Sequence, residues 1–436
     1  MTTTAPTPEM TSVPAPQEIE APKPAARLVS LDALRGFDMF WIIGADTVVM
    51  AIFKPLVNST NHPTAAKCAA VIVEQMDHVP WRGFHFYDLI FPMFVFIVGA
   101  SLVFSLSKAI ERGGKGRAIR RVIIRGAVLY LFGIIYYGGL SHAFGGLYVD
   151  RGQPVPPETH NAFMRIIADI RFMGVLQRIA ISYTFAGLLF CFFRPRVLAG
   201  ICAGLLLLYW GLLVAFHPGQ PKVSYDENQN LTNWIDVHYL PGFKWDGDHD
   251  PEGLLSSIPA VGGCLLGVFA GLLLRTPKLG GYQKAGILVI GGALFILIGM
   301  IWGGIPINLQ DGGWTIPQSA QFPVIKKIWT SSFVMLTAGC ASVLLGVFYL
   351  VIDVWKQRWI ATPFVWIGMN AITLYLVWRF TDDMKDISAT LVGGRHGELA
   401  AHLPPHTLTI AQPVVGLLLI VLLARFLYKR QIFLRV

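Results

Sequence analysis

The stretch FYDLIFPMFVFIVGASLVFSLS occupies residues 86–107, and IRRVIIRGAVLYLFGIIYYGGL occupies residues 119–140. Each stretch is long and apolar enough to cross the roughly 30 Å hydrocarbon layer of a membrane as one α-helix. The connection between them, KAIERGGKGRA at residues 108–118, is short and rich in Lys and Arg. Short basic loops stay on the cytoplasmic side of a membrane. The segment therefore predicts two membrane helices joined by a cytoplasmic turn.

The same pattern repeats along the chain of 436 residues, of which 54% are hydrophobic and only 14% are charged. So much apolar surface needs lipid, and it predicts an all-α, polytopic membrane protein with about ten transmembrane helices. The expected spans are residues 34–54, 86–107, 119–140, 172–193, 197–216, 256–274, 284–303, 330–353, 361–380 and 409–428. Residues 1–26, rich in Thr, Pro and Ala, are expected to form a disordered cytoplasmic tail. The five cysteines lack metal-binding spacing, so neither a disulfide framework nor a metal site is predicted.

Charge is distributed unequally between the loops of the two sides. The loops after the even-numbered spans are short and carry Lys108, Arg112, Lys115, Arg117, Arg194, Arg196, Arg275, Lys278, Lys356, Arg358, Lys429 and Arg430. The long loop at residues 217–256 instead carries Asp226, Glu227, Asp236, Asp246, Asp248, Asp250 and Glu252. The positive-inside rule predicts that both termini are cytoplasmic and that the long loops face the periplasm or exterior. The membrane is expected to be a bacterial inner membrane.

The two faces suit different partners. An acidic outer face raises the local concentration of a cationic substrate. The basic inner face, which includes Arg120, Arg121 and Arg125, suits a polyanion such as lipid head groups or a phosphorylated cofactor. Orientation alone also explains that basic face, and both interpretations stay open. Because the same loops account for the net charge of +9, no nucleic-acid partner is predicted.

Several charged groups lie in or beside the expected spans. Asp32 and Arg35 are three residues apart and share a helix face, either as a structural ion pair or as functional groups. Asp46 lies deeper in the first span, where a carboxylate is costly unless it faces a partner or a wet cavity. Arg178 lies within the fourth span and needs an anion, which is either a carboxylate of the protein or a ligand phosphate.

His78 stands in the aromatic loop HVPWRGFHFYD, which leads into the second span. Its imidazole exchanges protons near neutral pH, a property that suits acyl transfer. A histidine in a loop is more often without such a role, and the crowding aromatic residues are what favour the catalytic interpretation. Asp88 ends this loop at the start of the expected helix, where capping of the helix is the alternative to a binding role.

Together these segments resemble the heparan-α-glucosaminide N-acetyltransferase family, including its bacterial members. The resemblance runs in order through S-x-D-x-x-R-G at Ser30–Gly36, H-x-x-W-x-G-x-x-x-x-D-L at His78–Leu89, F-P-x-F-V-F-I-x-G at Phe91–Gly99, G-V-L-Q-R at Gly174–Arg178, D-P-E-G at Asp250–Gly253, Ile328–Ser332, G-M-N at Gly368–Asn370 and the tail Leu427–Val436. It covers most of the chain, so residues 27–436 are expected to form one transmembrane acyltransferase domain.

The resemblance implies transfer of acetyl from cytosolic acetyl-CoA to the amine of a terminal glucosamine across the membrane. The family's active-site histidine corresponds to His78, and Asp46 stands where members carry an asparagine, so both are expected to be catalytic. Expected contacts are Arg35, Arg120, Arg121, Arg125, Gln177 and Arg178 for acetyl-CoA, and Trp81, Asp88, Asp250, Glu252 and Asn370 for the sugar, with no metal. Because the chain lacks the family's large luminal domain and extra first helix, a free amino sugar or short glycan is the expected acceptor.

Two other functions remain compatible with the sequence. A secondary transporter of amino sugars would also have many helices and intramembrane charges, although no paired broken-helix repeats are evident. An O-acyltransferase of an envelope glycan would differ only in its acceptor. For the acetyltransferase, His78 as a general base is preferred to His78 as an acetyl carrier, because the sequence shows no dedicated partner that would make it a strong nucleophile. The oligomeric state stays open, a homodimer included.

Overall fold

The computed structural model describes residues 28–59, 62–137, 170–304, 322–380, 388–392 and 405–434. Regular structure in these ranges is helical, and isolated bridges such as that between Arg82 and Ile325 are the nearest approach to a strand there. The prediction of an all-α membrane protein is therefore confirmed. The expected tail at residues 1–26 lies outside the described residues.

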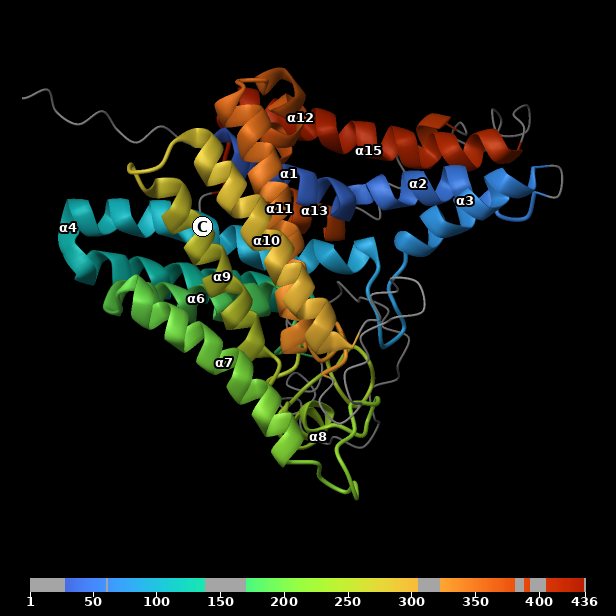
Figure 1. The fold of residues 1–436 in the computed structure, drawn as a ribbon. Helices are drawn as coiled ribbons and strands as arrows, with labels where there is room; N and C mark the ends of the chain where they lie inside the picture. Colours follow the sequence, from blue (N-terminus) through green and yellow to red (C-terminus); the bar gives the residue numbers. More distant parts are fainter. Residues whose placement is uncertain are drawn as a thin grey trace, which may run out of the picture.

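The helices follow one another as a bundle of long, mostly apolar elements (Figure 1). Their bounds are α1 Val29–Phe40, η1 Trp41–Ala45, α2 Asp46–Phe53, η2 Lys54–Leu56, α3 Pro63–Gln75, η3 Phe86–Leu89, α4 Ile90–Tyr136, α6 Val175–Phe192, α7 Pro195–Ala215, α8 Leu231–Tyr239, α9 Ser257–Arg275, α10 Gly281–Gly303, α11 Ser331–Phe348, η5 Tyr349–Val354, α12 Arg358–Met369, α13 Ala371–Phe380 and α15 Pro405–Lys429.

Helix α4 contains two of the expected spans. Its helical geometry is interrupted at Gly113 and at Gly114, whose φ of +72° lies in the left-handed region that favours glycine. Figure 1 shows α4 doubling back at this point into two arms, as the short basic connection predicted.

The number of spans stays a prediction. Among the described residues, eight helices are long and apolar enough to cross a membrane, α4 counted once, or nine with the bent pair of α12 and α13. The bend between α12 and α13 is 62° and falls at Asn370.

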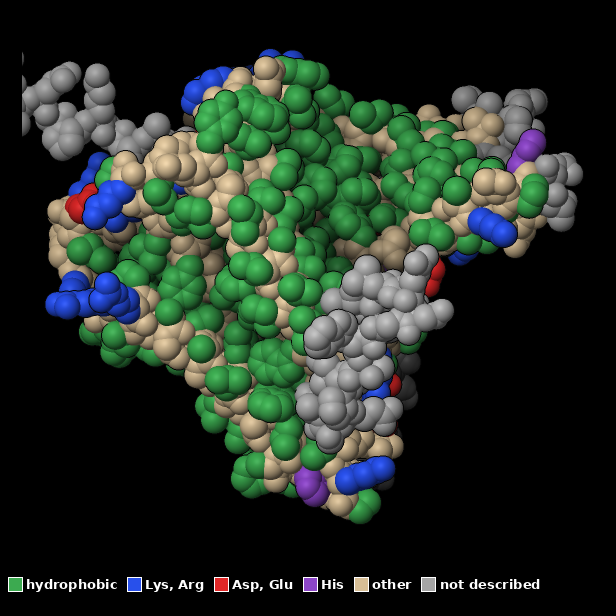
Figure 2. Space-filling model, in the orientation of Figure 1, with side chains coloured by type: hydrophobic (Ala, Val, Ile, Leu, Met, Phe, Trp, Pro, Cys, Tyr) green, Lys and Arg blue, Asp and Glu red, His purple; other side chains and the backbone are tan. Residues whose placement is uncertain are grey.

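The surface of the bundle matches a lipid environment. Large apolar side chains are exposed along the outer helices, including Leu208 on α7, Ile290 on α10 and Leu422 on α15. Figure 2 shows apolar side chains covering much of the visible face, with Lys and Arg gathered at the turn of α4. This separation is what a multi-pass membrane protein requires, because a charged side chain is costly where it would face lipid.

Close backbone contact fixes α1 against α12. A Cβ atom added to Gly36 would collide with the carbonyl oxygen of Phe364, and one added to Gly368 would collide with the carbonyl oxygen of Asp32. Small residues allow membrane helices to approach in this way and to gain van der Waals contact. The two helices therefore pack as one rigid pair, and the 62° bend at Asn370 directs α13 away from it.

Candidate active site

His78 lies in the loop between α3 and η3, and its ring meets the carboxylate of Asp88. His78 Nδ1 is 2.8 Å from Asp88 Oδ1, and the two side chains are 49% and 1% exposed. The second oxygen, Oδ2, accepts hydrogen bonds from the backbone N–H groups of His85 at 3.1 Å and Val79 at 3.3 Å. Asp88 therefore caps η3 and holds His78 at the same time. The sequence interpretation that His78 has no dedicated partner is wrong.

Lys326, from the segment before α11, reaches the same pair. Its Nζ is 3.1 Å from Asp88 Oδ1 and lies 2.8 Å and 3.2 Å from Nδ1 and Nε2 of His78. Burial lowers the pKa of Lys326, while the carboxylate of Asp88 opposes that shift. If the imidazole carries its hydrogen on Nδ1, that N–H and the ammonium both donate to Asp88. Nε2 then keeps its lone pair but faces the Lys326 ammonium at 3.2 Å, and the ammonium must turn away before Nε2 can accept a proton from a substrate.

Asp46 touches this group through an aromatic neighbour. The ring of Tyr87 lies 4.9 Å from the ring of His78, and the hydroxyl of Tyr87 interacts with the carboxylate of Asp46. Asp46 stands half-buried at the start of α2. The side chain of Tyr87 thus lies between Asp46 and His78. This arrangement suits a role of Asp46 in positioning Tyr87 better than a direct part in the reaction.

Two cavities meet at His78, and both have His78, Lys326 and Glu252 in their walls. One cavity, of about 490 Å³, extends between apolar side chains of α1, η1, α4, α6 and α13, among them Met39, Ile42, Phe91, Phe94, Leu176 and Ile372. The other, of about 460 Å³, is walled by charged and aromatic groups, among them Tyr137, Arg171, Trp245, Asp246 and Lys327. The two cavities share His78, Tyr136, Val175, Trp245, Glu252 and Lys326, so His78 stands where a more apolar cavity adjoins one with more charged groups.

Arg171 lines the polar cavity and is held there by two acids. Its guanidinium donates to both oxygens of Asp250, at 2.8 Å and 2.7 Å, and to Glu252 Oε2 at 2.6 Å. The same group lies over the rings of Tyr137 at 4.4 Å and Trp245 at 5.1 Å. Burial alone would lower the pKa of Arg171, but the bonds to Asp250 and the charge of Glu252 outweigh it and raise the pKa.

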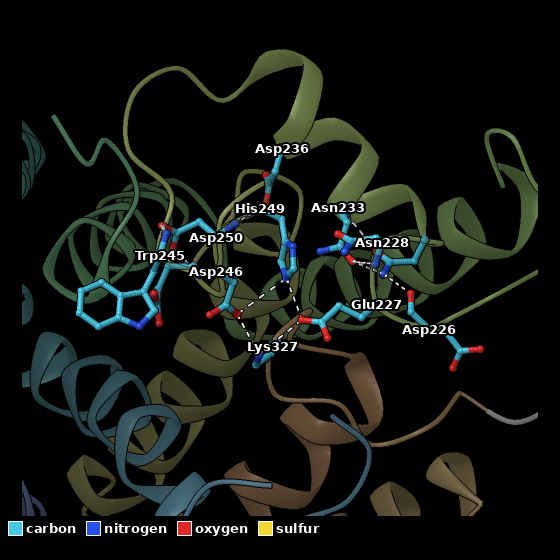
Figure 3. Close-up of polar contacts among 12 residues, drawn as sticks. Asp226, Glu227, Asn228, Asn233, Asp236, Trp245, Asp246, His249, Asp250 and Lys327 are labelled. Carbon is cyan, nitrogen blue, oxygen red and sulfur yellow. Dashed lines mark hydrogen bonds and ion pairs between the residues drawn. The ribbon is translucent and has the colours of Figure 1, made fainter. Parts of the chain in front are cut away.

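The two acids that hold Arg171 were both expected to bind sugar, and they are placed differently. Asp250 is 1% exposed and occupied by Arg171 and by the backbone N–H of Trp245, which lies beside it in Figure 3. Glu252 borders both cavities and can face a ligand. Burial raises the pKa of Glu252, and the charge of Arg171 opposes that shift.

Only Nη2 of Arg178 has hydrogen-bond partners among the described residues, whereas Nε and Nη1 have none. The side chain is fully buried, donates to the Gly253 carbonyl at 3.3 Å and to the Ser256 hydroxyl, and lies 4.6 Å from the centre of the Trp329 ring. Its expected neighbour Gln177 is also buried and donates to the Arg171 carbonyl at 2.9 Å. Both side chains thus connect protein segments, rather than line the two cavities.

The structure separates Arg178 from the inner arginines. Where α4 packs on α6, Gly133 faces Gln177 and Gly126 faces Thr184. At 1.5 Å per residue, this register puts Arg178 about 10 Å further along the helix pair than Arg125. Arg178 and Arg125 therefore lie at different levels of the helix pair.

The other arginines expected to bind acetyl-CoA, which are Arg35, Arg120, Arg121 and Arg125, differ in their surroundings. Arg120 and Arg121 are exposed, whereas Arg125 is half-buried over the Tyr183 ring at 5.1 Å. Arg35 lies 3.5 Å from Asp32 and donates to the Ser101 hydroxyl at 2.6 Å.

The remaining expected contacts lie outside the two cavities. Trp81 donates from its indole N–H to the Tyr225 carbonyl at 2.8 Å. Asn370, 2% exposed, donates to the Trp366 carbonyl at 3.1 Å, and its Oδ1 accepts no hydrogen bond from the described residues. Both side chains therefore shape the fold around the cavities.

The sequence interpretation missed Lys326, Lys327 and Arg171. A signal for them was present, because basic residues at the expected outer side run against the positive-inside bias. Such residues need a local reason, and here that reason is a set of buried or half-buried acids.

No family model matches the chain. The chain is 26% identical over 407 residues to the heparan-alpha-glucosaminide N-acetyltransferase of Homo sapiens, a match that covers 82% of this chain and 55% of that protein. It is 25% identical over 403 residues to the protein of the same name from Mus musculus, covering 82% and 56%. The chain therefore spans about half the length of the curated relatives it matches. The resemblance expected from the motifs is confirmed.

Proposed function

We propose that this chain, as a relative of the heparan-α-glucosaminide N-acetyltransferases, is a transmembrane acetyltransferase that acts on an amino sugar. The donor would be acetyl-CoA, and the acceptor would be glucosamine or a short amino-sugar glycan. The observation that carries the proposal is the junction of two unlike cavities at His78. Acyl transfer between a thioester and a sugar needs such a place, where an apolar acyl arm and a polar acceptor meet beside one base.

Each cavity has the chemistry of one substrate. The apolar cavity suits the acetyl end and the slender pantetheine arm of CoA, because it is walled by side chains such as Ile42 and Phe94. Where the polar cavity adjoins it, Glu252 offers a carboxylate for hydroxyl or amine groups and Trp245 offers a ring for apolar contact with a sugar face. The polar cavity adds the charged groups Asp246 and Lys327.

The proposed reaction is a direct transfer in a ternary complex. The amine nitrogen of the sugar attacks the thioester carbon, and the carbon–sulfur bond breaks as the amide forms. The proton lost by the amine passes to His78 Nε2 and from there to the CoA thiolate, so the products are an acetamido sugar and free CoA. A positioned base of this kind contributes typically about 10²–10⁴-fold to the rate.

The neighbours of His78 support this role. Asp88 at 2.8 Å would fix the ring and favour its positive form while the proton is held. The ammonium of Lys326, 3.2 Å from Nε2, would stand near the thioester oxygen as negative charge develops there. A histidine paired with an aspartate could also carry the acetyl group covalently, so the test below distinguishes this mechanism from the general base.

The orientation of the donor is part of the proposal. Acetyl-CoA would enter from the cytoplasm, with its phosphates near the exposed Arg120 and Arg121. The amino sugar would enter on the periplasmic side of a bacterial inner membrane, where the acidic loop around α8 would face. Labelling of a Tyr239→Cys variant by an impermeant reagent in intact cells tests this side, with Cys68 replaced by Ser because it is exposed.

The function is tested with purified protein in detergent, supplied with acetyl-CoA and a panel of amino sugars and neutral sugars. We expect acetamido products by mass spectrometry, with no need for an ion gradient. His78→Ala should remove most turnover, whereas His217→Ala should not, because His217 lies outside both cavities.

Four outcomes discriminate between the functions and between the mechanisms. Ester products would indicate an O-acyltransferase, and gradient-driven sugar uptake without CoA release would indicate a transporter. A burst of one CoA per chain without sugar, with acetyl on His78, would replace the general base by a carrier. A fully active His78→Ala variant would refute both mechanisms.

A further inference from the structure

A second polar cluster lies beside the polar cavity, in the segments around α8. Glu227 precedes α8, whereas Asp246 and His249 follow it, and Figure 3 shows the three side chains converging with Lys327. The ligand-type atoms of the two carboxylates and the imidazole all lie within 4.8 Å of one another. The cluster thus joins two segments that the nine-residue helix α8 separates in the sequence.

His249 is the unusual member of this cluster. It is 1% exposed, yet neither ring nitrogen makes a hydrogen bond with any described residue. A buried polar group left in this way costs about 1–3 kcal/mol. The Nε2 atom is directed at the two carboxylates, 3.5 Å from Glu227 Oε1 and 3.7 Å from Asp246 Oδ2, which is too far for a good hydrogen bond.

These separations match the edges of a metal-coordination shell. Zinc binds imidazole nitrogen and carboxylate oxygen at about 2.0–2.2 Å, so two ligand atoms on a tetrahedral ion lie about 3.4 Å apart. The turn that contains Asp246 and His249 is closed by a 3.1 Å hydrogen bond from the Asp246 N–H to the His249 carbonyl. At Gly247 this turn has a φ of +85°. Two of the three ligand groups are therefore held together by the backbone.

The charge of the cluster favours a divalent cation over the single ammonium of Lys327. Two carboxylates and a neutral imidazole carry a charge of about −2. Lys327 Nζ lies 3.0 Å from Asp246 Oδ2 and 3.4 Å from Glu227 Oε1, so it supplies one positive charge at the mouth of the cluster. An ammonium has no lone-pair acceptor and leaves the imidazole without a partner, whereas a divalent metal ion would take all three ligands and cancel the charge.

We propose that Glu227, Asp246 and His249 form a binding site for a divalent transition-metal ion of the zinc class, and that Lys327 competes with the ion for the two carboxylates. The bound ion connects the segments on either side of α8. Because Asp246 and Lys327 also line the polar cavity, the ion fixes one wall of that chamber and releases Lys327 towards it. This site is independent of whether the chain is an acetyltransferase, and it departs from the expectation of no metal.

The test uses the full chain in detergent, with any affinity tag removed and metals stripped by EDTA. Zn²⁺ is added, excess ion is removed by gel filtration, and bound zinc is counted by mass spectrometry. We expect one Zn²⁺ per chain, and Co²⁺ in its place should give the visible absorption of a site with nitrogen and oxygen ligands. His249→Ala should abolish binding, and Glu227→Gln, at a half-exposed position, should weaken it by at least about tenfold without unfolding the protein.

Two further variants separate a metal site from an ion-pair network. Lys327→Met should tighten Zn²⁺ binding if the lysine competes with the ion, whereas a network without metal would gain nothing. His238→Ala is the matched control, because His238 is an exposed histidine on α8 and should bind zinc as the unaltered chain does. Zinc content equal in the unaltered chain and in His249→Ala would overturn the proposal, as would a Lys327→Met variant that binds zinc more weakly.

Discussion

Replacing Asp88 by Asn should slow turnover and lower stability, because Lys326 loses its ion pair, while donor binding stays nearly unchanged. In the structure, Asp88 Oδ1 takes a hydrogen bond from His78 Nδ1 and an ion pair from Lys326, while Oδ2 caps η3. An asparagine keeps one oxygen for the cap. Its NH₂ group then faces the histidine and favours the tautomer with hydrogen on Nε2, which removes the lone pair that takes the proton.

The size of the effect follows from the hydrogen bond that the substitution removes. A hydrogen bond to a charged group contributes about 1.5–3 kcal/mol. If that stabilisation acts only when His78 carries the proton, each 1.36 kcal/mol lowers the rate about tenfold. We therefore expect kcat to fall roughly 10- to 150-fold, with the KM for acetyl-CoA close to its original value.

The assay is CoA release at saturating acetyl-CoA and sugar, followed with a thiol reagent. Asp226→Asn is the matched control, because Asp226 forms an exposed ion pair with Arg82 at 2.6 Å and such pairs contribute little. Thermal unfolding in detergent verifies that both variants are folded. A folded Asp88→Asn variant with unchanged kcat would show that the contact between Asp88 and His78 plays no part in the reaction.

Three further predictions address charge. Burial lowers the pKa of Lys326, so activity that depends on its ammonium should decline at a pH below the pKa of an ordinary lysine. Lys326→Arg should move that decline to higher pH. Rate–pH profiles that coincide for the two proteins would contradict this. The double variant Arg120→Ala/Arg121→Ala should raise the KM for acetyl-CoA, because each charge-assisted hydrogen bond to a phosphate contributes about 1.5–3 kcal/mol to binding. An unchanged KM would mean that these residues only orient the protein in the membrane. Burial raises the pKa of Asp236 to about 6, so the folded state retains a proton that the unfolded chain releases, and the unfolding temperature should fall as the pH rises from about 4 to about 6. Asp236→Asn should flatten that dependence, and an equally steep curve in the variant would refute the assignment.

The helices could be predicted from the sequence because the thickness of a membrane sets the length of an apolar stretch. The hairpin of α4 is the clearest case, since both arms and their basic turn at Gly114 agree with the prediction. The bend at Asn370 was not predicted, because residues 361–380 are apolar on both sides of it. Hydropathy measures how apolar a segment is, and it contains no information about the direction of its axis.

Side-chain partners were harder to predict than helices. The aromatic loop and the family resemblance pointed to His78, but Lys326 lies 248 residues away in the sequence, and a contact of that range leaves no local pattern. The expectation for Arg178 rested on a sound rule, that a buried guanidinium needs acceptors. The acids Asp250 and Glu252 hold Arg171 instead, and Arg178 is left with neutral oxygens and the Trp329 ring.

The backbone contact between α1 and α12 determines which part of the bundle can yield when a ligand arrives. Gly36 and Gly368 leave no space for α12 to slide along α1 without a steric clash. Beyond Asn370 that restraint ends, and α13 contributes Ile372 and Tyr375 to the wall of the apolar cavity. Entry of the pantetheine arm would therefore be accommodated by rotation of α13 about Asn370, while α1 and α12 stay in place.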